Sequence, residues 1–175
     1  MQQFDLHQGD RIVSPNATAN GVPGRSISVR TDLGNPVTAW QPAGNIAGDE
    51  RFFCHGYSLG TFGRWGYTVW GGFMATVLAD EYQTLGQLDR ISRTAANQNP
   101  VVPGDILVWW LGGKDAYHSA VIDEPVYLPD GPLDKDNTAV GSKTGTGPLW
   151  RGHLARDVKE QYKPAAYIEV YRRNA

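Results

Sequence analysis

The sequence predicts an α+β fold in which a short helical lobe packs on a small antiparallel β-sheet. Glycine (21) and proline (11) are frequent and charged residues make up only 19% of the chain, which favours turns and short strands over a helical bundle. The best helical pattern lies at residues 73–88, where apolar side chains recur at roughly helical spacing. From Asp105 onward, apolar runs alternate with turn-forming residues, which is typical of strands.

We expect residues 1–175 to form a single domain, because no repeat, low-complexity tract or linker divides the chain. Residues 1–45 predict an N-terminal β extension that either packs on the main body or projects as an arm. Residues 46–175 are expected to form the core. In the extension, the predicted strands are 11–13, 26–30 and 36–40, and the predicted turns are Asn16, Asn20-Gly21, Pro23-Gly24 and Gly34-Asn35-Pro36.

The core is expected to contain two helices followed by strands. The first helix, residues 54–62, begins at or just before Cys54, and the second is the 73–88 segment. Residues 93–104 and 144–157 are predicted to be loops, and residues 123–138 are predicted to be a long loop or two short strands. The predicted strands are 105–110, 117–122, 138–143 and 167–171, and the first two of them form a hairpin across a glycine-containing turn.

Composition argues against several classes of protein. The net charge is −2 and no basic run is present, so nucleic-acid binding has little electrostatic support. No apolar stretch reaches membrane-spanning length. The N-terminal MQQFDLHQGD has neither the basic nor the apolar region of a classical signal peptide, so we expect a cytoplasmic protein, one exported by a signal-independent route, or a fragment of a longer chain.

Cys54 is the only cysteine and opens the stretch CHGYSLGTFGRWGYTVW. One cysteine forms no internal disulfide. Its immediate neighbours His55, Gly56 and Ser58 are small or polar, so the segment is not an ordinary apolar stripe. His118 lies further along, in the predicted strand YHSAVI, and a cysteine with a distant histidine is the arrangement of a thiol nucleophile and its base. The alternative is a buried cysteine that acts as a small hydrophobic residue.

The order of these segments resembles the papain-like cysteine hydrolases of the NlpC and CHAP kinds. A cysteine-led helix, a second helix, the segment PGDILVWW at 103–110 and the strand HSAVI at 118–122 follow one another, and the resemblance covers about residues 46–145. It implies a papain-like fold. The sequence departs from the family pattern at Tyr117, where glycine commonly precedes the histidine, and at His55, where the residue after the cysteine is usually small or aromatic.

The same resemblance implies the catalytic roles. Cys54 would be the nucleophile, with its backbone N–H in the oxyanion hole, and His118 the general base. The third residue is expected on the strand at 138–143, where Ser142 can accept a hydrogen bond from the imidazole. Lys143 ranks lower because a charged lysine accepts none. His153 is the main rival to Ser142 as the residue that orients His118.

Further residues complete the predicted site. His55 is either a partly exposed helix residue or a direct participant. Trp65, Tyr117 and Trp150 are candidates for a cleft wall that contacts a peptide or sugar. The cysteine and histidines show no zinc-ligand spacing and the glycines no phosphate-loop fingerprint, so neither a metal nor another cofactor is expected.

The predicted function is a thiol hydrolase that cleaves amide bonds. Peptidoglycan amidase or endopeptidase is the commonest activity of the resembling families, and an antibacterial effector, phage-type lysin or toxin domain fits a compact domain. A toxin would have a dedicated inhibitor or immunity protein as partner. The alternatives are a protein-modifying cysteine enzyme (a deamidase, peptidase or acyltransferase) and a non-catalytic binding module on the same scaffold.

Overall fold

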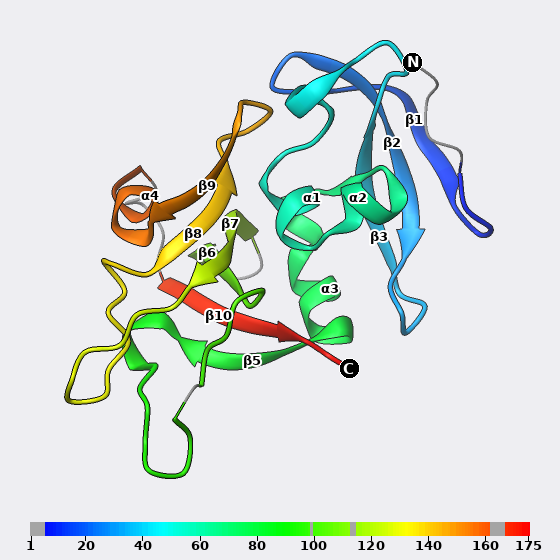
Figure 1. Ribbon diagram of the computed structural model, residues 1–175. Helices are drawn as coiled ribbons and strands as arrows, with labels where there is room; N and C mark the ends of the chain where they lie inside the picture. Colours follow the sequence, from blue (N-terminus) through cyan, green and yellow to red (C-terminus); the bar gives the residue numbers. More distant parts are fainter. Residues whose placement is uncertain (1–5, 99, 113–114, 162–166) are drawn as a thin grey trace.

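The computed structural model describes residues 6–98, 100–112, 115–161 and 167–175. Two antiparallel sheets lie on either side of a group of short helices (Figure 1). The predicted α+β class is therefore confirmed, with two sheets rather than the single small one expected. In the described part of the chain, the helices are too short and too polar for any of them to span a membrane.

The first sheet has the strand order β1-β2-β3-β4. Its strands are β1 (Arg11–Ala19), β2 (Val22–Arg30), β3 (Pro36–Pro42) and β4 (Thr68–Val69). β4 pairs with β3 through Ala39↔Val69. A strand from the predicted core (residues 46–175) therefore joins the sheet formed by the predicted N-terminal extension (residues 1–45). The extension is thus packed on the main body rather than projecting as an arm.

The turn predictions in this sheet have mixed outcomes. Asn20 (φ 49°) and Gly21 (φ 80°) form the predicted tight turn between β1 and β2, in the left-handed conformation that asparagine and glycine tolerate best. The turn predicted at Pro23-Gly24 is wrong, because both residues lie inside β2. A Cβ on Gly24 would come within 2.4 Å of the Trp40 indole nitrogen, so this glycine serves close packing. Asn16 lies within β1 at a register irregularity and forms no turn between strands.

The first predicted helix is divided in two, and the second ends earlier than expected. The segment 54–62 forms α1 (Cys54–Ser58) and α2 (Thr61–Trp65), separated at Gly60, whose φ is 69°. The segment 73–88 contains α3 (Met74–Glu81), and strand β5 (Tyr82–Gln87) replaces the rest of the predicted helix. β5 pairs with the C-terminal strand, and this tertiary pairing overrides the helical pattern. Short 3₁₀ turns η1 (Gly48–Arg51), η2 (Gly71–Phe73) and η3 (Leu88–Arg90) complete this group.

The second sheet has six strands in the order β5-β10-β6-β7-β8-β9. Its other members are β6 (Ile106–Gly112), β7 (Asp115–Glu124), β8 (Ala139–Lys143), β9 (Leu149–Leu154) and β10 (Tyr167–Arg173). The four predicted core strands are confirmed within a few residues. The predicted loop at 144–157 is wrong, since it contains β9 and the start of α4 (Ala155–Gln161).

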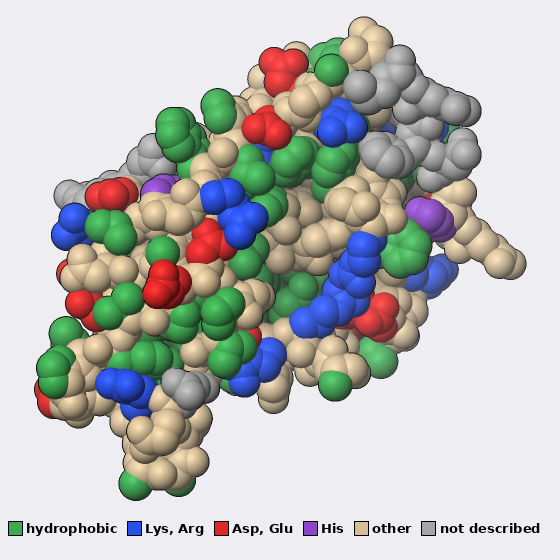
Figure 2. Space-filling view, in the orientation of Figure 1, with side chains coloured by type: hydrophobic (Ala, Val, Ile, Leu, Met, Phe, Trp, Pro, Cys, Tyr) green, Lys and Arg blue, Asp and Glu red, His purple; other side chains and the backbone are tan. Residues whose placement is uncertain are grey.

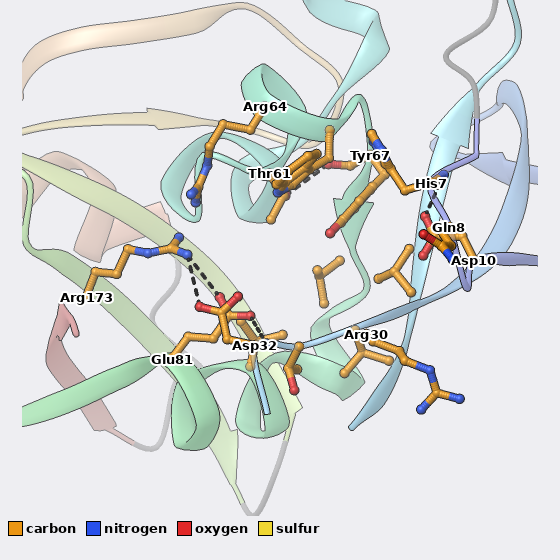
Figure 3. Close-up of a pocket in the computed structure, with 16 residues that line it drawn as sticks. His7, Gln8, Asp10, Arg30, Asp32, Thr61, Arg64, Tyr67, Glu81 and Arg173 are labelled. Carbon is orange, nitrogen blue, oxygen red and sulfur yellow. Dashed lines mark hydrogen bonds and ion pairs between the residues drawn. The ribbon is translucent and has the colours of Figure 1, made fainter. Parts of the chain in front are cut away.

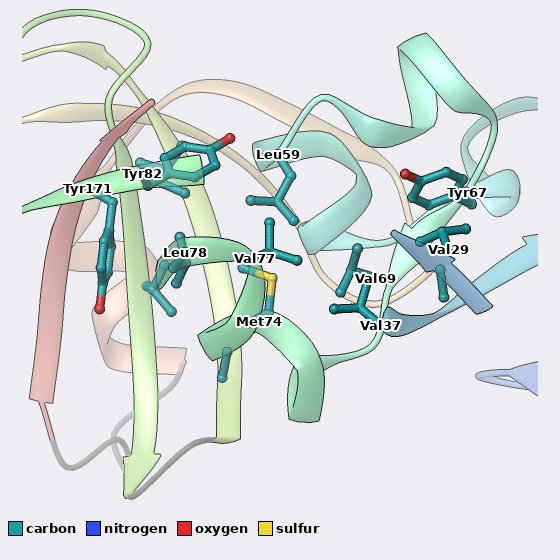
Figure 4. Close-up of a cluster of buried hydrophobic side chains, with 14 of the residues drawn as sticks. Val29, Val37, Leu59, Tyr67, Val69, Met74, Val77, Leu78, Tyr82 and Tyr171 are labelled. Carbon is teal, nitrogen blue, oxygen red and sulfur yellow. The ribbon is translucent and has the colours of Figure 1, made fainter. Parts of the chain in front are cut away.

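Hydrophobic clusters cover both faces of the six-stranded sheet. One cluster lies between the two sheets and includes Val37 and Val69 from the first sheet and Met74 and Val77 from α3 (Figure 4). The other includes Trp109 and Val140 on the opposite face. Since strand side chains alternate between faces, each β7 residue points either toward the helices or away from them.

Candidate active site

Cys54 is the first residue of α1 and lines a cavity of about 300 Å³. Only 6% of the residue is exposed. The aromatic residues Phe53, Trp70 and Tyr117 line the same cavity, and so does His118. The structure therefore brings three of the predicted site residues, Cys54, His118 and Tyr117, to one cavity wall.

His55 also reaches this cavity, and it is buried rather than partly exposed as a helix-surface residue would be, with 3% exposed. Its Nδ1 lies 3.7 Å from Cys54 Sγ and 2.7 Å from Ser119 Oγ. Its Nε2 lies 3.3 Å from the carbonyl oxygen of Ala116. An imidazole from the adjacent residue of the same helix thus lies within hydrogen-bonding reach of the thiol.

Two serines that the sequence analysis did not single out connect α1 to β7. Ser58 Oγ donates to the Cys54 carbonyl over 2.9 Å and also contacts Ser119 Oγ. All of these side chains are buried. A sequence signal for Ser58 exists, because it follows Cys54 by four residues and therefore lies on the same helix face.

His118 faces the other side of β7 from Ser119. Its ring centroid lies 5.1 Å from that of Trp109, its cross-strand neighbour, and Trp109 belongs to the hydrophobic cluster on the far face of the sheet. Ser119, the next residue, bonds toward α1. His118 thus shares the cavity wall with Cys54, while its ring packs on the opposite face.

Ser142 and His153, the two predicted partners of His118, are bonded to each other. Ser142 Oγ lies 3.0 Å from His153 Nε2 across the β8–β9 pair. Ser142 is paired with Ala120 on β7, so it shares the sheet face of His118. Burial lowers the pKa of His118 well below its usual value, and the charges of His55 and His153 act in the same direction.

Burial opposes a separate charge on either member of the Cys54–His55 pair. It raises the pKa of the Cys54 thiol to about 11, although hydrogen bonding from the Ser119 and His55 backbone N–H groups opposes this rise. It lowers the pKa of His55 to about 4. A thiolate and an imidazolium formed together about 4 Å apart would attract each other by roughly 4 kcal/mol at an effective dielectric constant of about 20. Moving a proton within the pair therefore costs less than ionising both groups independently.

Lys143 is fully buried on β8. Its Nζ donates to the Asp49 carbonyl over 2.5 Å and to the Gly147 carbonyl, and it lies 4.2 Å from the Phe52 ring centroid. Ala120↔Ser142 and Val121↔Gly141 are paired in register, and continuing that register by one residue places Lys143 beside Ser119 on the α1 face. A buried ammonium thus lies on the same side of the sheet as the Cys54 network.

Trp65 and Trp150 lie away from the Cys54 cavity wall. Trp65 borders a larger cavity of about 400 Å³ and packs edge-on against His7, with ring centroids 4.7 Å apart. Trp150 is 58% exposed on β9. Neither is placed where it would contact a substrate bound against Cys54 alone.

The larger cavity carries ionic groups and no cysteine. Arg64 and Arg173 extend into it, and Arg173 pairs with Asp32 at 3.5 Å and Glu81 at 3.6 Å (Figure 3). On the face shown in Figure 2, basic and acidic side chains form small separate groups among hydrophobic ones. This side shows no broad basic surface among the residues described.

No cluster of three or more histidine, cysteine, aspartate or glutamate side chains suited to a metal ion occurs within the described ranges. Comparison of the chain with protein-family models, curated proteins and solved structures finds no match in any of the three. The function must therefore be argued from the site itself.

Proposed function

We propose that this protein is a thiol hydrolase of papain-like design that cleaves amide bonds, with Cys54 as the nucleophile. The observation that carries the proposal is the position of Cys54, at the start of a helix, on a cavity wall, with the imidazole of His55 3.7 Å from its sulfur. A nucleophile within reach of a base, and a base held by a third group, is the arrangement that covalent catalysis requires.

The packing of α1 against β7 supports the papain-like part of the proposal. A cysteine at a helix start faces a central strand of an antiparallel sheet, and that strand carries His118 and Ser119. The Pro-Gly-Asp segment leads into β6, which pairs with β7 as the resemblance implies.

In the proposed reaction the Cys54 thiolate attacks the amide carbonyl carbon, and the resulting acyl-enzyme is hydrolysed by water. The amine leaves after receiving the proton that the thiol lost. Phe53, Trp70 and Tyr117 would hold the apolar part of the substrate on the cavity wall. By the resemblance, the stem peptide of peptidoglycan is the first substrate to test, and an antibacterial effector is the first biological role.

The test is release of new amino groups from purified peptidoglycan by wild-type protein, Cys54→Ala and Cys54→Ser. We expect loss of turnover by about 10³-fold or more in both variants, since the alcohol is a much poorer nucleophile. Trp150→Ala is the matched control, because this exposed aromatic side chain lies outside the cavity lining. Equal turnover by wild type and Cys54→Ala would end the hydrolase proposal.

A protein-modifying cysteine enzyme remains the second candidate, since the same nucleophile serves deamidation and acyl transfer. Incorporation of a labelled amine into protein substrates would favour acyl transfer, and ammonia release from glutamine side chains would favour deamidation. Co-purification of a small inhibitor protein with the chain would support the toxin role.

The raised pKa of Cys54 and its small exposed fraction favour a third candidate, a binding module with a structural cysteine. The rate of Cys54 alkylation by iodoacetamide between pH 4 and 10 separates the two classes. A thiol that stays inert throughout this range supports the binding module, and measurable alkylation near neutral pH supports the hydrolase.

A further inference from the structure

We propose that His55, rather than His118, accepts the proton of Cys54. The inference rests on the proposed thiol hydrolase, and it assigns the base of that site. Nδ1 of His55 lies 3.7 Å from Cys54 Sγ, and the other ring nitrogen, Nε2, is held by the Ala116 carbonyl at 3.3 Å.

The Ala116 carbonyl fixes which nitrogen of His55 carries the proton. A carbonyl oxygen only accepts, so Nε2 must donate to it. In the neutral imidazole Nδ1 then has a lone pair and no proton. That lone pair is directed at Ser119 Oγ, 2.7 Å away, and lies near the Cys54 sulfur. Neutral His55 is therefore in the tautomer that a proton acceptor for Cys54 requires.

The hydrogen-bond network around His55 lacks one proton until this transfer occurs. It runs from the Ala116 carbonyl through His55, Ser119 and Ser58 to the Cys54 carbonyl. The two ends are carbonyl oxygens, which accept hydrogen bonds and donate none. The hydrogens for all four contacts must therefore come from the imidazole and the two hydroxyl groups. A neutral imidazole and two hydroxyls supply one hydrogen too few. The imidazolium supplies the missing one, and every contact is then satisfied.

The ring of His118 points away from α1, to the other face of β7 from Ser119. Its ring packs on Trp109 on the opposite face of the sheet, while Ser119 occupies the face toward α1. Among the described residues, the titratable groups that act on the pair include His118 on β7 and Lys143 on β8, and these two are in turn influenced by His153 and Asp49 respectively. Lys143 favours a thiolate, whereas a charged His118 would oppose the imidazolium.

The transfer is balanced within the pair. The S–H bond of Cys54 breaks, an N–H bond forms at His55 Nδ1, and the sulfur electron pair attacks the substrate carbonyl carbon. His55 then returns the proton to the nitrogen of the leaving amine as the C–N bond breaks. Ser119 is a positioning residue, because its hydroxyl accepts from Nδ1–H only after the transfer.

The first test needs no substrate and is read from the wild-type protein. The ¹⁵N chemical shifts of the imidazole nitrogens are measured at pH 7 in the wild-type protein, with His55 assigned by comparison with His55→Gln. The expected result is a neutral ring protonated at Nε2. A His55 protonated at Nδ1 alone overturns the proposal, because that nitrogen then has no lone pair for the Cys54 proton.

The second test compares alkylation of Cys54 by iodoacetamide at pH 7 in wild type, His55→Gln and His118→Gln. We expect the His55 variant to lose 10²-fold or more, within the range for removal of a general base, and the His118 variant to stay within 5-fold. Circular dichroism verifies that each variant folds. Should His55→Gln not fold, Ser119→Ala is used in its place, with an expected loss of about 10-fold.

The outcomes separate this inference from the proposed function. A wild-type Cys54 that is inert at every pH ends the hydrolase proposal itself. A reactive Cys54 that depends on His118 and not on His55 overturns only the assignment of the base.

Discussion

His118 and Ser119 are consecutive residues of β7 that face opposite sides of the six-stranded sheet. Ser119 bonds to His55 and Ser58 on α1, whereas the ring of His118 packs 5.1 Å from that of Trp109. The period of a strand is two residues, so a shift of one position in the pairing of β7 would exchange these roles. The β6–β7 pair has register irregularities on both sides of Trp110, next to the Trp109–His118 pair. These irregularities therefore help to determine which face of the sheet His118 occupies.

The buried histidines predict that stability falls in mild acid. Burial lowers the pKa of His55 to about 4, against an ordinary value of 6.5, so the unfolded chain binds the proton more readily. The stabilisation is fully present above pH 6.5 and is lost as the pH falls toward about 4, by roughly 3 kcal/mol for this residue. Burial shifts the pKa of His118 in the same direction.

Urea unfolding followed at pH 7.5 and at pH 4.5 measures this loss. We expect a lower free energy of unfolding at pH 4.5 in the wild type and a smaller difference in His55→Gln. A His7→Gln variant is the control, because His7 is exposed near the N-terminus. Equal stability at the two pH values would contradict the buried, neutral state of these imidazoles.

Gly71 and Gly72 offer a matched pair of substitutions beside the site. A Cβ on Gly71 would come within 2.3 Å of the Ala116 carbonyl oxygen, which is the acceptor of His55 Nε2. A Cβ on Gly72 would meet only Asp115 Oδ1 at 3.5 Å, an ordinary contact. We expect Gly71→Ala to slow Cys54 alkylation at pH 7 by 10-fold or more and Gly72→Ala to leave it within 2-fold. Equal rates in the two variants would show that the Ala116 carbonyl does not hold the imidazole.

The Pro-Gly-Asp segment contributes a buried ion pair to the base of the sheet. Asp105 is 3% exposed and receives both Arg172 Nε, at 2.8 Å, and Arg172 Nη2, at 2.6 Å. Removing one partner of such a pair leaves an uncompensated buried charge and typically costs 3–5 kcal/mol. We expect Arg172→Met to lower the free energy of unfolding by about 3 kcal/mol in urea titrations. Arg156→Met, which removes an exposed pair with Asp157, should change it by less than about 0.5 kcal/mol.

The sequence predicted the elements of the core better than the orientation of side chains within them. Strands 105–110, 117–122, 138–143 and 167–171 carry apolar runs that fit a buried sheet, and all four are present. The helix expected at 73–88 ends at Glu81 because β5 pairs with β10, whose residues lie 82 to 91 positions further along the chain, and no local pattern reveals such a partner. The site shows the same limit. Cys54 and His118 reach one cavity, but only the paired register shows that Ser119 faces α1 and that the ring of His118 faces Trp109.

The last prediction concerns Lys143, which is fully buried. A buried ammonium is costly unless it is hydrogen-bonded and paired with a negative charge. In the described part of the chain its partners are the carbonyls of Asp49 and Gly147 and the Phe52 ring, rather than a carboxylate. Burial lowers its pKa, while the negative charges of Asp49 and of an ionised Cys54 oppose that shift. Such coupling is reciprocal, so the ammonium must favour the Cys54 thiolate to the same extent.

Lys143→Met keeps an unbranched side chain one atom shorter and removes the charge and the hydrogen-bond donors. We expect the apparent pKa of Cys54, measured from alkylation rates between pH 7 and 12, to rise further in this variant. Two buried carbonyls also lose their donor, so the free energy of unfolding should fall by about 1–3 kcal/mol. Lys135→Met, at a half-exposed lysine paired with Asp89, is the matched control and should change neither quantity measurably. If Lys143→Met lowers stability but leaves the pKa of the Cys54 thiol unchanged, the role of the lysine is to connect the 48–51 turn to the loop after β8. The Cys54 thiolate would then be stabilised by the hydrogen bonds of Ser119 and His55 without a contribution from Lys143.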